Sequence, residues 1–188
     1  MKKELREIIN SDLYRMGGDL SKRSLITNIM LNPAFKFIYT HRKCNFYRSK
    51  NKLKYLFYRA RLYRMNLKYG FEISNEAKIG MGFKIDHRGA IVINPNAIIG
   101  KNVNVTSGVL IGQQNRGNKK GAPKIGNNVW IGANSSIVGK ISIGNNVLIA
   151  PGAFINFDVP DNSIVIGNPG IIKNSDMATK GYIGWPVN

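Results

Sequence analysis

A six-residue periodicity in the second half of the chain constrains the fold more than any other feature of the sequence. An α-helix has 3.6 residues per turn and a β-strand has a side-chain period of 2, so neither produces a strict period of six. Short repeats without a slip are typical of solenoids, in which each coil stacks on the coil before it. The period is marked by Ile125, Ile131, Ile137, Ile143, Ile149 and Ile155, and earlier by Ile93, Ile99, Val105 and Ile111 and by Ile73, Ile79 and Ile85.

This repeat predicts a mainly β protein, a parallel β-helix in which each six-residue unit is one short strand followed by a corner. The repeated isoleucine is expected to point into the core and to stack on its equivalent one coil away. Corners require backbone freedom, which Gly and Asn supply. The pairs Asn127-Asn128 and Asn145-Asn146 fall where corners are expected.

Two interruptions of the repeat indicate where function is placed. Ile85 and Ile93 lie eight residues apart instead of six, and the extra pair falls in the segment 86–89, Asp-His-Arg-Gly. Ile111 and Ile125 lie fourteen residues apart, which leaves room for a protruding loop over residues 113–123. Bulges and ejected loops on a regular scaffold are common positions for functional residues.

Residues 1–70 follow different rules and read as a basic, α-helical N-terminal segment. They hold 17 of the 28 basic residues and only 4 of the 10 acidic ones. Helices are predicted over residues 52–68, 25–30 and 34–42, and His41 is expected on a helix surface. The longest has apolar residues at helical spacing, namely Leu53, Leu56, Phe57, Ala60, Tyr63 and Leu67. We expect the β-helix over residues 71–172 and a C-terminal tail over 173–188.

Composition excludes several classes of site. Cys44 is the single cysteine, so an intrachain disulfide and a Cys-based zinc site are excluded. His41 and His87 are the two histidines, and we expect no metal. No apolar run is long enough to span a bilayer, and the charged start lacks an apolar signal segment. A cytoplasmic protein is therefore expected.

Several segments within about residues 70–172 resemble the hexapeptide-repeat acyltransferases, most of all the serine acetyltransferase branch. The segments that carry the resemblance are KIGMGFKIDHRGAIVI, NVTSGVLIG, PKIGNNVWIGANSSIVGKISIG and VIGNPGIIK. The resemblance implies a left-handed β-helix and a homotrimer. It also implies that acetyl-coenzyme A binds between neighbouring β-helices and passes its acetyl group directly to a hydroxyl or an amine.

The resemblance also assigns the reacting groups. His87 aligns with the family's catalytic histidine and Glu72 with the acid that orients it, while Asp86 either contacts the acceptor or caps a turn. This assignment makes chemical sense, because a neutral imidazole can take the proton from an alcohol as it attacks a thioester. A carboxylate on the other ring nitrogen fixes the tautomer and stabilises the imidazolium.

Five further residues are expected to contact the coenzyme, although each also has a structural explanation. Gly112, Ala133 and Gly152 align with positions where related enzymes bring their backbone close to the pantetheine arm, but they also suit corners and a small core. Lys140 is a candidate partner for a coenzyme phosphate. Trp130 would pack over the coenzyme or an acceptor ring, or cover a trimer seam.

The acceptor is expected to be a sugar rather than serine. Serine acetyltransferases carry Arg-His at the end of the active-site loop, whereas Gly121 and Ala122 occupy those positions here. We therefore expect an acetyl-coenzyme A-dependent O-acetyltransferase that acts on a hydroxyl of a bacterial capsular or surface polysaccharide or its precursor. A serine O-acetyltransferase with a reworked pocket and a non-catalytic β-helix scaffold remain as alternatives.

The basic N-terminal segment leaves several partners open. Aromatic residues interleave with Arg and Lys there, a pattern that suits nucleic acid, an anionic membrane surface or an acidic polysaccharide. Because the sequence contains no DNA- or RNA-binding motif, no nucleic acid is expected. A helical cap over the first coil is the simpler interpretation, with peripheral contact at the inner face of the membrane as an alternative.

Overall fold

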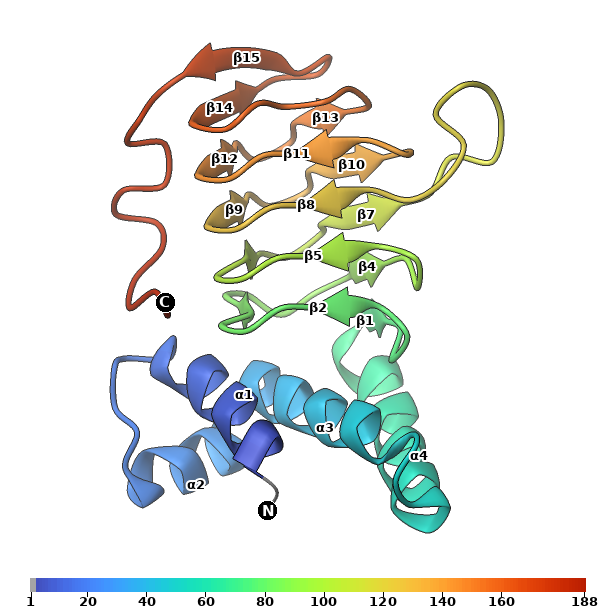
Figure 1. Cartoon of the computed structure of the whole chain (residues 1–188), viewed down its shortest axis with the longest axis vertical. Helices are drawn as coiled ribbons and strands as arrows, with labels where there is room; N and C mark the ends of the chain where they lie inside the picture. Colours follow the sequence, from blue (N-terminus) through green and yellow to red (C-terminus); the bar gives the residue numbers. More distant parts are fainter. Residues whose placement is uncertain (1–2) are drawn as a thin grey trace.

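A computed structural model describes residues 3–188 as a helical base from which a stack of coils rises (Figure 1). The helices are α1 (Lys3–Tyr14), α2 (Lys22–Leu31), α3 (Pro33–Tyr47) and α4 (Lys52–Tyr69). Gly70 ends α4 in a left-handed conformation, with φ at 71°, and the first strand begins at the next residue. The mainly β architecture with an N-terminal helical segment is therefore confirmed.

The coils form three sheets that run along the stack. The first sheet contains β1 (Phe71–Ile73), β4 (Ile91–Ile93), β7 (Leu110–Gly112), β10 (Ser136–Val138) and β13 (Phe154–Ile155). The second contains β2 (Lys78–Ile79), β5 (Ile98–Ile99), β8 (Lys124–Ile125) and β11 (Ser142–Ile143). The third contains β3 (Lys84–Ile85), β6 (Asn104–Val105), β9 (Val129–Ile131), β12 (Val147–Ile149), β14 (Ser163–Ile166) and β15 (Ile171–Asn174).

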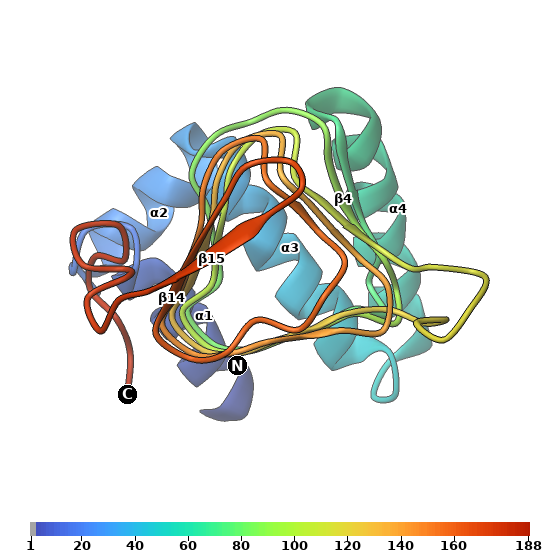
Figure 2. The same cartoon turned by 90° about the horizontal axis from the view of Figure 1, so that it is seen from above.

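Neighbouring strands pair in parallel, except that β15 runs antiparallel to β14. In Figure 1 the chain passes in front from right to left through β8, turns through β9 and returns behind through β10 while it rises, which is a left-handed turn (Figures 1 and 2). The left-handed β-helix implied by the resemblance is therefore confirmed.

The repeated isoleucines form the core of the coil, as expected. Ile131, Ile137, Ile149 and Ile155 are completely buried, and the register pairs Ile111 with Ile137 and Ile137 with Ile155. Corner asparagines take the left-handed conformation, because φ is 54° at Asn128 and 51° at Asn146. The six-residue period thus predicted both the strands and the corners.

The helical base contains one helix that the sequence reasoning missed. Leu5, Ile9 and Leu13 of α1 pack with Phe35 of α3 in a small separate core. The predicted helices over 25–30, 34–42 and 52–68 are α2, α3 and α4, each longer than expected. None of the helices in residues 3–188 is both long and apolar enough to cross a membrane.

The apolar stripe that helical spacing marks on α4 faces away from the rest of the protein. Leu53 is 80% exposed and Leu67 is 72% exposed. The side of α4 that packs on the core carries Tyr55, Tyr58, Leu62, Met65 and Tyr69 instead. This helix is therefore apolar on two sides, and the spacing of aliphatic residues alone selected the outer one.

The expectation that His41 lies at the surface is wrong. Its side chain is 3% exposed, and Nε2 lies 3.1 Å from the Ser74 carbonyl oxygen. The ring is buried because α3 lies across the open end of the first coil, where Phe37 packs edge-on against Phe71. Burial, with a further contribution from Arg42, lowers the pKa of His41 from 6.5 to about 4.

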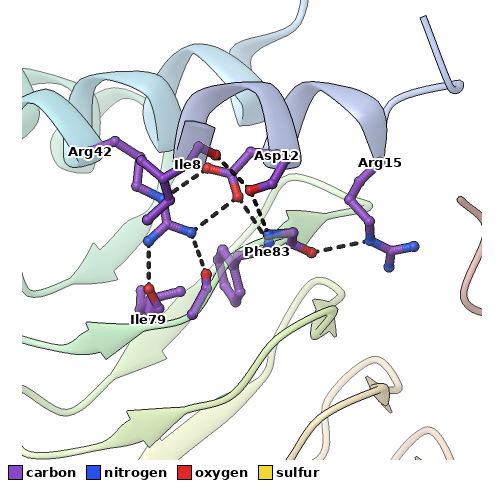
Figure 3. A network of polar contacts seen from close by, with 9 residues as sticks. Ile8, Asp12, Arg15, Arg42, Ile79 and Phe83 are labelled. Carbon is purple, nitrogen blue, oxygen red and sulfur yellow. Dashed lines mark hydrogen bonds and ion pairs between the residues drawn. The ribbon is translucent and has the colours of Figure 1, made fainter. Parts of the chain in front are cut away.

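A buried ionic network joins the helical base to the first coil (Figure 3). Arg42 of α3 pairs with Asp12 of α1 at 2.8 Å, and both side chains are almost completely buried. The same guanidinium donates to the carbonyls of Ile79 and Gly80. Asp12 also accepts from the Phe83 amide at 3.0 Å. The pair therefore satisfies backbone groups at the end of the coil that would otherwise lack partners.

The buried imidazole predicts a pH dependence of stability. The folded pKa of His41 lies below its unfolded value, so its contribution is complete above about pH 6.5 and is lost as the pH falls toward about 4. Between pH 7 and 4.5, we expect the wild type to lose about 2–3 kcal/mol more than His41→Gln, which keeps a donor for Ser74. Urea unfolding at a series of pH values measures this difference. The exposed His87→Gln is the control and should follow the wild type.

Candidate active site

His87 lies in an enlarged corner between β3 and β4. The register shows the enlargement directly, because Ile85 pairs with Val105 and Ile93 pairs with Ile111, so eight residues on one coil match six on the next. The His87 side chain is exposed. The two-residue insertion therefore displays an imidazole at the edge between the third and first sheets.

Gly89 lets this corner pack closely against the coil above it. Its φ is 147°, and an added Cβ would lie 2.9 Å from the Cβ of Ser107. On the other side, an added Cβ on Gly70 would lie 3.4 Å from the Gly89 carbonyl carbon. The His87 corner is thus held between the start of β1 and the Ser107 corner.

Glu72 lies on the neighbouring strand, on the outer face of the first sheet. It is exposed in the middle of β1 and stands opposite Val92 of β4, the strand that follows the His87 corner. Within residues 3–188, no hydrogen bond joins the side chains of Glu72 and His87. The fold brings the two into the same region without fixing their contact.

Asp86 is the most firmly held of the three expected catalytic residues. Its carboxylate accepts from Lys84 Nζ and from Asn104 Nδ2, both at 2.9 Å. Asn104 is 1% exposed, and its Oδ1 accepts from the guanidinium of Arg15, which is completely buried. Arg15 also donates to the carbonyls of Gly82 and Gly184. A polar chain therefore runs from α1 to the residue beside His87.

Asn104 and Arg15 were missed because no local signal marks them. Asn104 occupies an outward-facing strand position, and Arg15 looks like one of many basic residues. Asn104 becomes buried because the C-terminal tail covers it, and Tyr182 offers it a carbonyl at 3.4 Å. Only the path of the tail could have identified both residues.

Ala133 and Gly152 extend the His87 edge along the stack. The Gly152 amide donates to the Ala133 carbonyl at 2.8 Å, and the Asn134 amide donates to the Ser107 carbonyl at 3.0 Å. An added Cβ on Gly152 would meet nothing within 4 Å. Small residues thus form an open track above His87 at the same edge.

Gly112 and Lys140 lie at the opposite edge of the first sheet, beside the protruding loop. The Gly139 amide donates to the Gly112 carbonyl at 3.1 Å, and the Lys140 amide donates to the Lys119 carbonyl at 2.8 Å. Gly121 approaches Lys140 so closely that an added Cβ would lie 3.1 Å from the lysine Cβ. The first sheet is therefore bordered by His87 on one side and by the loop on the other.

Trp130 does not join either group. It stands on the outer face of the third sheet, and its ring packs against Tyr182 of the tail with the centroids 4.7 Å apart. Cys44 is buried in α3, and burial raises the pKa of its thiol to about 11. Within residues 3–188, no three His, Cys, Asp or Glu side chains gather as a metal site would require.

A cavity of about 860 Å³ lies away from His87, between α1, α3 and the first strands of the second sheet. Its lining includes Glu4, Glu7, Arg42 and Lys78. The candidate catalytic residues instead lie on an open edge of the single protomer.

Comparison with known proteins agrees with this architecture. Residues 122–156 match the family described as bacterial transferase hexapeptide (six repeats). The putative colanic acid biosynthesis acetyltransferase WcaB of Escherichia coli (strain K12) is 39% identical over 134 residues, which cover 69% of this chain and 82% of that protein. The serine acetyltransferase of Staphylococcus aureus (strain Mu50 / ATCC 700699) is 37% identical over 131 residues, covering 70% of this chain and 62% of that enzyme.

This chain spans only part of the length of other relatives. Serine acetyltransferase 2 of Arabidopsis thaliana is 37% identical over 106 residues, 56% of this chain and 33% of the plant enzyme. Among solved structures, soybean serine acetyltransferase complexed with serine superposes with a TM-score of 0.76 at 27% identity, covering 90% of this chain and 69% of that one. The chain therefore belongs to the hexapeptide-repeat transferases, as an acetyltransferase of the serine acetyltransferase and WcaB type.

Proposed function

We propose that this enzyme transfers an acetyl group from acetyl-coenzyme A to a hydroxyl of a bacterial capsular or surface polysaccharide, or of its precursor. The observation that carries the choice of acceptor is the end of the active-site loop. Gly121 pairs with Gln114 through backbone hydrogen bonds, and neither Gly121 nor Ala122 carries a cationic side chain that could hold an amino-acid carboxylate as Arg-His does at these positions in serine acetyltransferases. The high coverage of WcaB supports the same choice.

The proposed mechanism uses His87 as the general base. The imidazole takes the acceptor hydroxyl proton while the oxygen attacks the thioester carbonyl, and it returns that proton to the departing thiolate. Glu72 would orient the ring once substrates are bound, because catalytic hydrogen bonds often tighten only then. Asp86 would contact the acceptor, since Lys84 and Asn104 hold its carboxylate in place.

The edge above His87 has the properties that a coenzyme requires. Acetyl-coenzyme A supplies the activated acyl group, and its long pantetheine arm needs a smooth path close to the backbone. Ala133 and Gly152 provide such a path, and Lys140 offers a cation for a phosphate on the far side of the first sheet. Trp130 is proposed to contribute through its packing with Tyr182 rather than by touching the coenzyme.

A homotrimer would complete the site. His87 and the loop border an open surface of one protomer, and a reaction that must exclude water requires that surface to be covered. A neighbouring copy placed along this edge would enclose the thioester between two coils. The proposed site therefore lies at a subunit interface.

Serine O-acetylation is the second candidate. It is favoured by the overlay with the soybean enzyme, which was solved with serine and covers 90% of this chain. The two candidates differ in the groups that must hold the acceptor, so a direct competition between acceptors separates them.

Acceptor preference is the first test. With acetyl-coenzyme A and either capsular repeat units or serine, we expect thiol release with the glycan, and a kcat/KM for serine at least about 100-fold lower. The estimate follows from the loss of two charge-assisted hydrogen bonds at Gly121 and Ala122. Efficient turnover of serine would instead support the second candidate.

Removal of the base is the second test. His87→Ala should lower kcat by about 10²–10⁴. Binding of coenzyme A in calorimetry should stay unchanged, because the imidazole acts on the acceptor. Lys173→Ala, at the far end of the coil in β15, is the control and should behave as the wild type. Unchanged turnover by His87→Ala would rule out the mechanism.

Support of Asp86 is the third test. Asn104→Ala should lower kcat by about tenfold and shift the pH profile of kcat/KM, since Asp86 loses a donor beside His87. It should also destabilise the fold by about 1–3 kcal/mol, because Arg15 loses a buried acceptor. Thr179→Val is the matched control, because it removes a 2.7 Å bond from the tail to Asn146 without touching Asp86. A loss of stability with an unchanged pH profile would make Asn104 purely structural.

A further inference from the structure

The outward side of α4 is an apolar surface that nothing in the described chain covers. We call this surface the α4 outer face. Phe57 is 60% exposed, Tyr63 is 64% exposed, and Leu53 and Leu67 are exposed further still. At 100° per residue these positions fall on one continuous stripe from Leu53 to Leu67, about 22 Å of the 18-residue helix. The α4 outer face consists of Leu53, Leu56, Phe57, Ala60, Tyr63 and Leu67.

The fold does not need this face, because the other side of α4 is already packed. Leu62 and Met65 are buried against the core, and the ring of Tyr58 stacks on Tyr47 of α3 with an interplanar angle of 5°. The helix is therefore anchored without its outer residues. Leaving several large apolar side chains in water is unfavourable, so a contiguous stripe of them marks an interaction surface.

The charges around the α4 outer face identify the kind of partner. The helix contains no Asp or Glu. Helical geometry places Lys52 and Arg59 along one border of the stripe, and Arg61 and Lys68 along the other, with Arg64 near its middle. An apolar stripe bordered on both sides by cations suits a partner whose apolar interior lies beneath a layer of anionic groups.

We propose that α4 lies flat on an anionic bilayer and inserts its outer face between the headgroups. The leucines and Phe57 would enter the acyl boundary, Tyr63 would sit at the headgroup level, and the Lys and Arg stems would extend outward to the phosphates. Each cation near such a surface adds to the attraction, and the attraction weakens as salt is added. A second α4 outer face fits less well as the partner, because this helix carries Lys and Arg residues and no Asp or Glu, so two such faces would repel each other.

This orientation places the candidate site beside the membrane. Gly70 connects α4 directly to β1, and it contacts Gly89 of the His87 corner. The first coil, which carries Glu72 and His87, is thus the coil nearest the helical base (Figure 1). If the proposed function holds, the acceptor is then a sugar presented at the bilayer surface, and this step rests on that function. Membrane binding itself is measured without acetyl transfer, so either can fail alone.

The experiment is flotation of the full chain with vesicles. We expect binding to vesicles of phosphatidylglycerol and phosphatidylethanolamine, weaker binding at high salt, and none to phosphatidylcholine alone. The triple variant Leu53→Ser, Phe57→Ser, Leu67→Ser should bind at least about tenfold more weakly. The matched control is Ile26→Ser, Met30→Ser, Leu31→Ser on α2, whose apolar residues are equally exposed but whose cations, Lys22 and Arg23, are confined to its first turn; it should bind as the wild type.

Three results would overturn the proposal. Failure of the wild type to float with the anionic vesicles is the first. The second is undiminished vesicle binding by the α4 triple variant together with loss of binding in the double variant Arg61→Gln, Arg64→Gln. That result would mean that the cations alone bind the partner, which would then be any polyanion, such as an acidic polysaccharide. The third combines two measurements. If the wild type does not bind vesicles, and light scattering shows an oligomer for the wild type but a monomer for the α4 triple variant, the α4 outer face is a contact between copies of the chain. Unchanged circular dichroism of each variant shows that it folds.

Discussion

The stacking of identical positions from coil to coil is the constraint on which the rest of the structure depends. Backbone amides bond to the coil above at each turn, as when Gly100 donates to Ile125 and Gly126 donates to Ile143. The isoleucine side chains stack in the same register, so a one-residue shift on any coil would misplace all its core residues. Extra residues can therefore be accommodated only outside the stack. The enlarged corner at His87 and the loop at 113–123 lie outward for this reason.

This constraint explains why the sequence predicts the coil well and the base poorly. Each isoleucine of the repeat marks a side chain that points into the core, and each break in the period marks a segment that leaves the stack. The His87 corner could therefore be located from the sequence. Helices carry no such register. In α4, Leu53 and Leu67 have the spacing of a core stripe, yet Tyr58 and Met65 make the packing contacts. The burial of His41 depends on α3 crossing the open coil, which no local pattern encodes.

The open end of the coil accounts for part of the basic composition. A β-helix that simply stopped would expose apolar residues such as Phe71 and unpaired carbonyls such as those of Ile79 and Gly80. α3 covers the former with Phe37, and Arg42 satisfies the latter while Asp12 balances its charge. Removing one member of such a buried pair typically costs about 3–5 kcal/mol. The interpretation of the base as a cap over the first coil therefore explains why Arg42 is buried. It also explains the burial of Arg15, which donates to the carbonyls of Gly82 and Gly184.

The same cap reaches the candidate site but does not account for α4. Arg15 from the first helix, Asn104 from the coil and a carbonyl from the tail meet next to Asp86, so three distant parts of the chain must fold before that carboxylate is placed. This coupling explains how a short corner can hold the Asp86 carboxylate in place without a pocket of its own. The cations of α4 bond to none of these groups, and all but Lys54, which lies over the Tyr47 ring, are on or beside the apolar stripe. Arg15 and Arg42 therefore serve the cap, whereas the cations of α4 lie on a helix whose outer face is directed away from the coil.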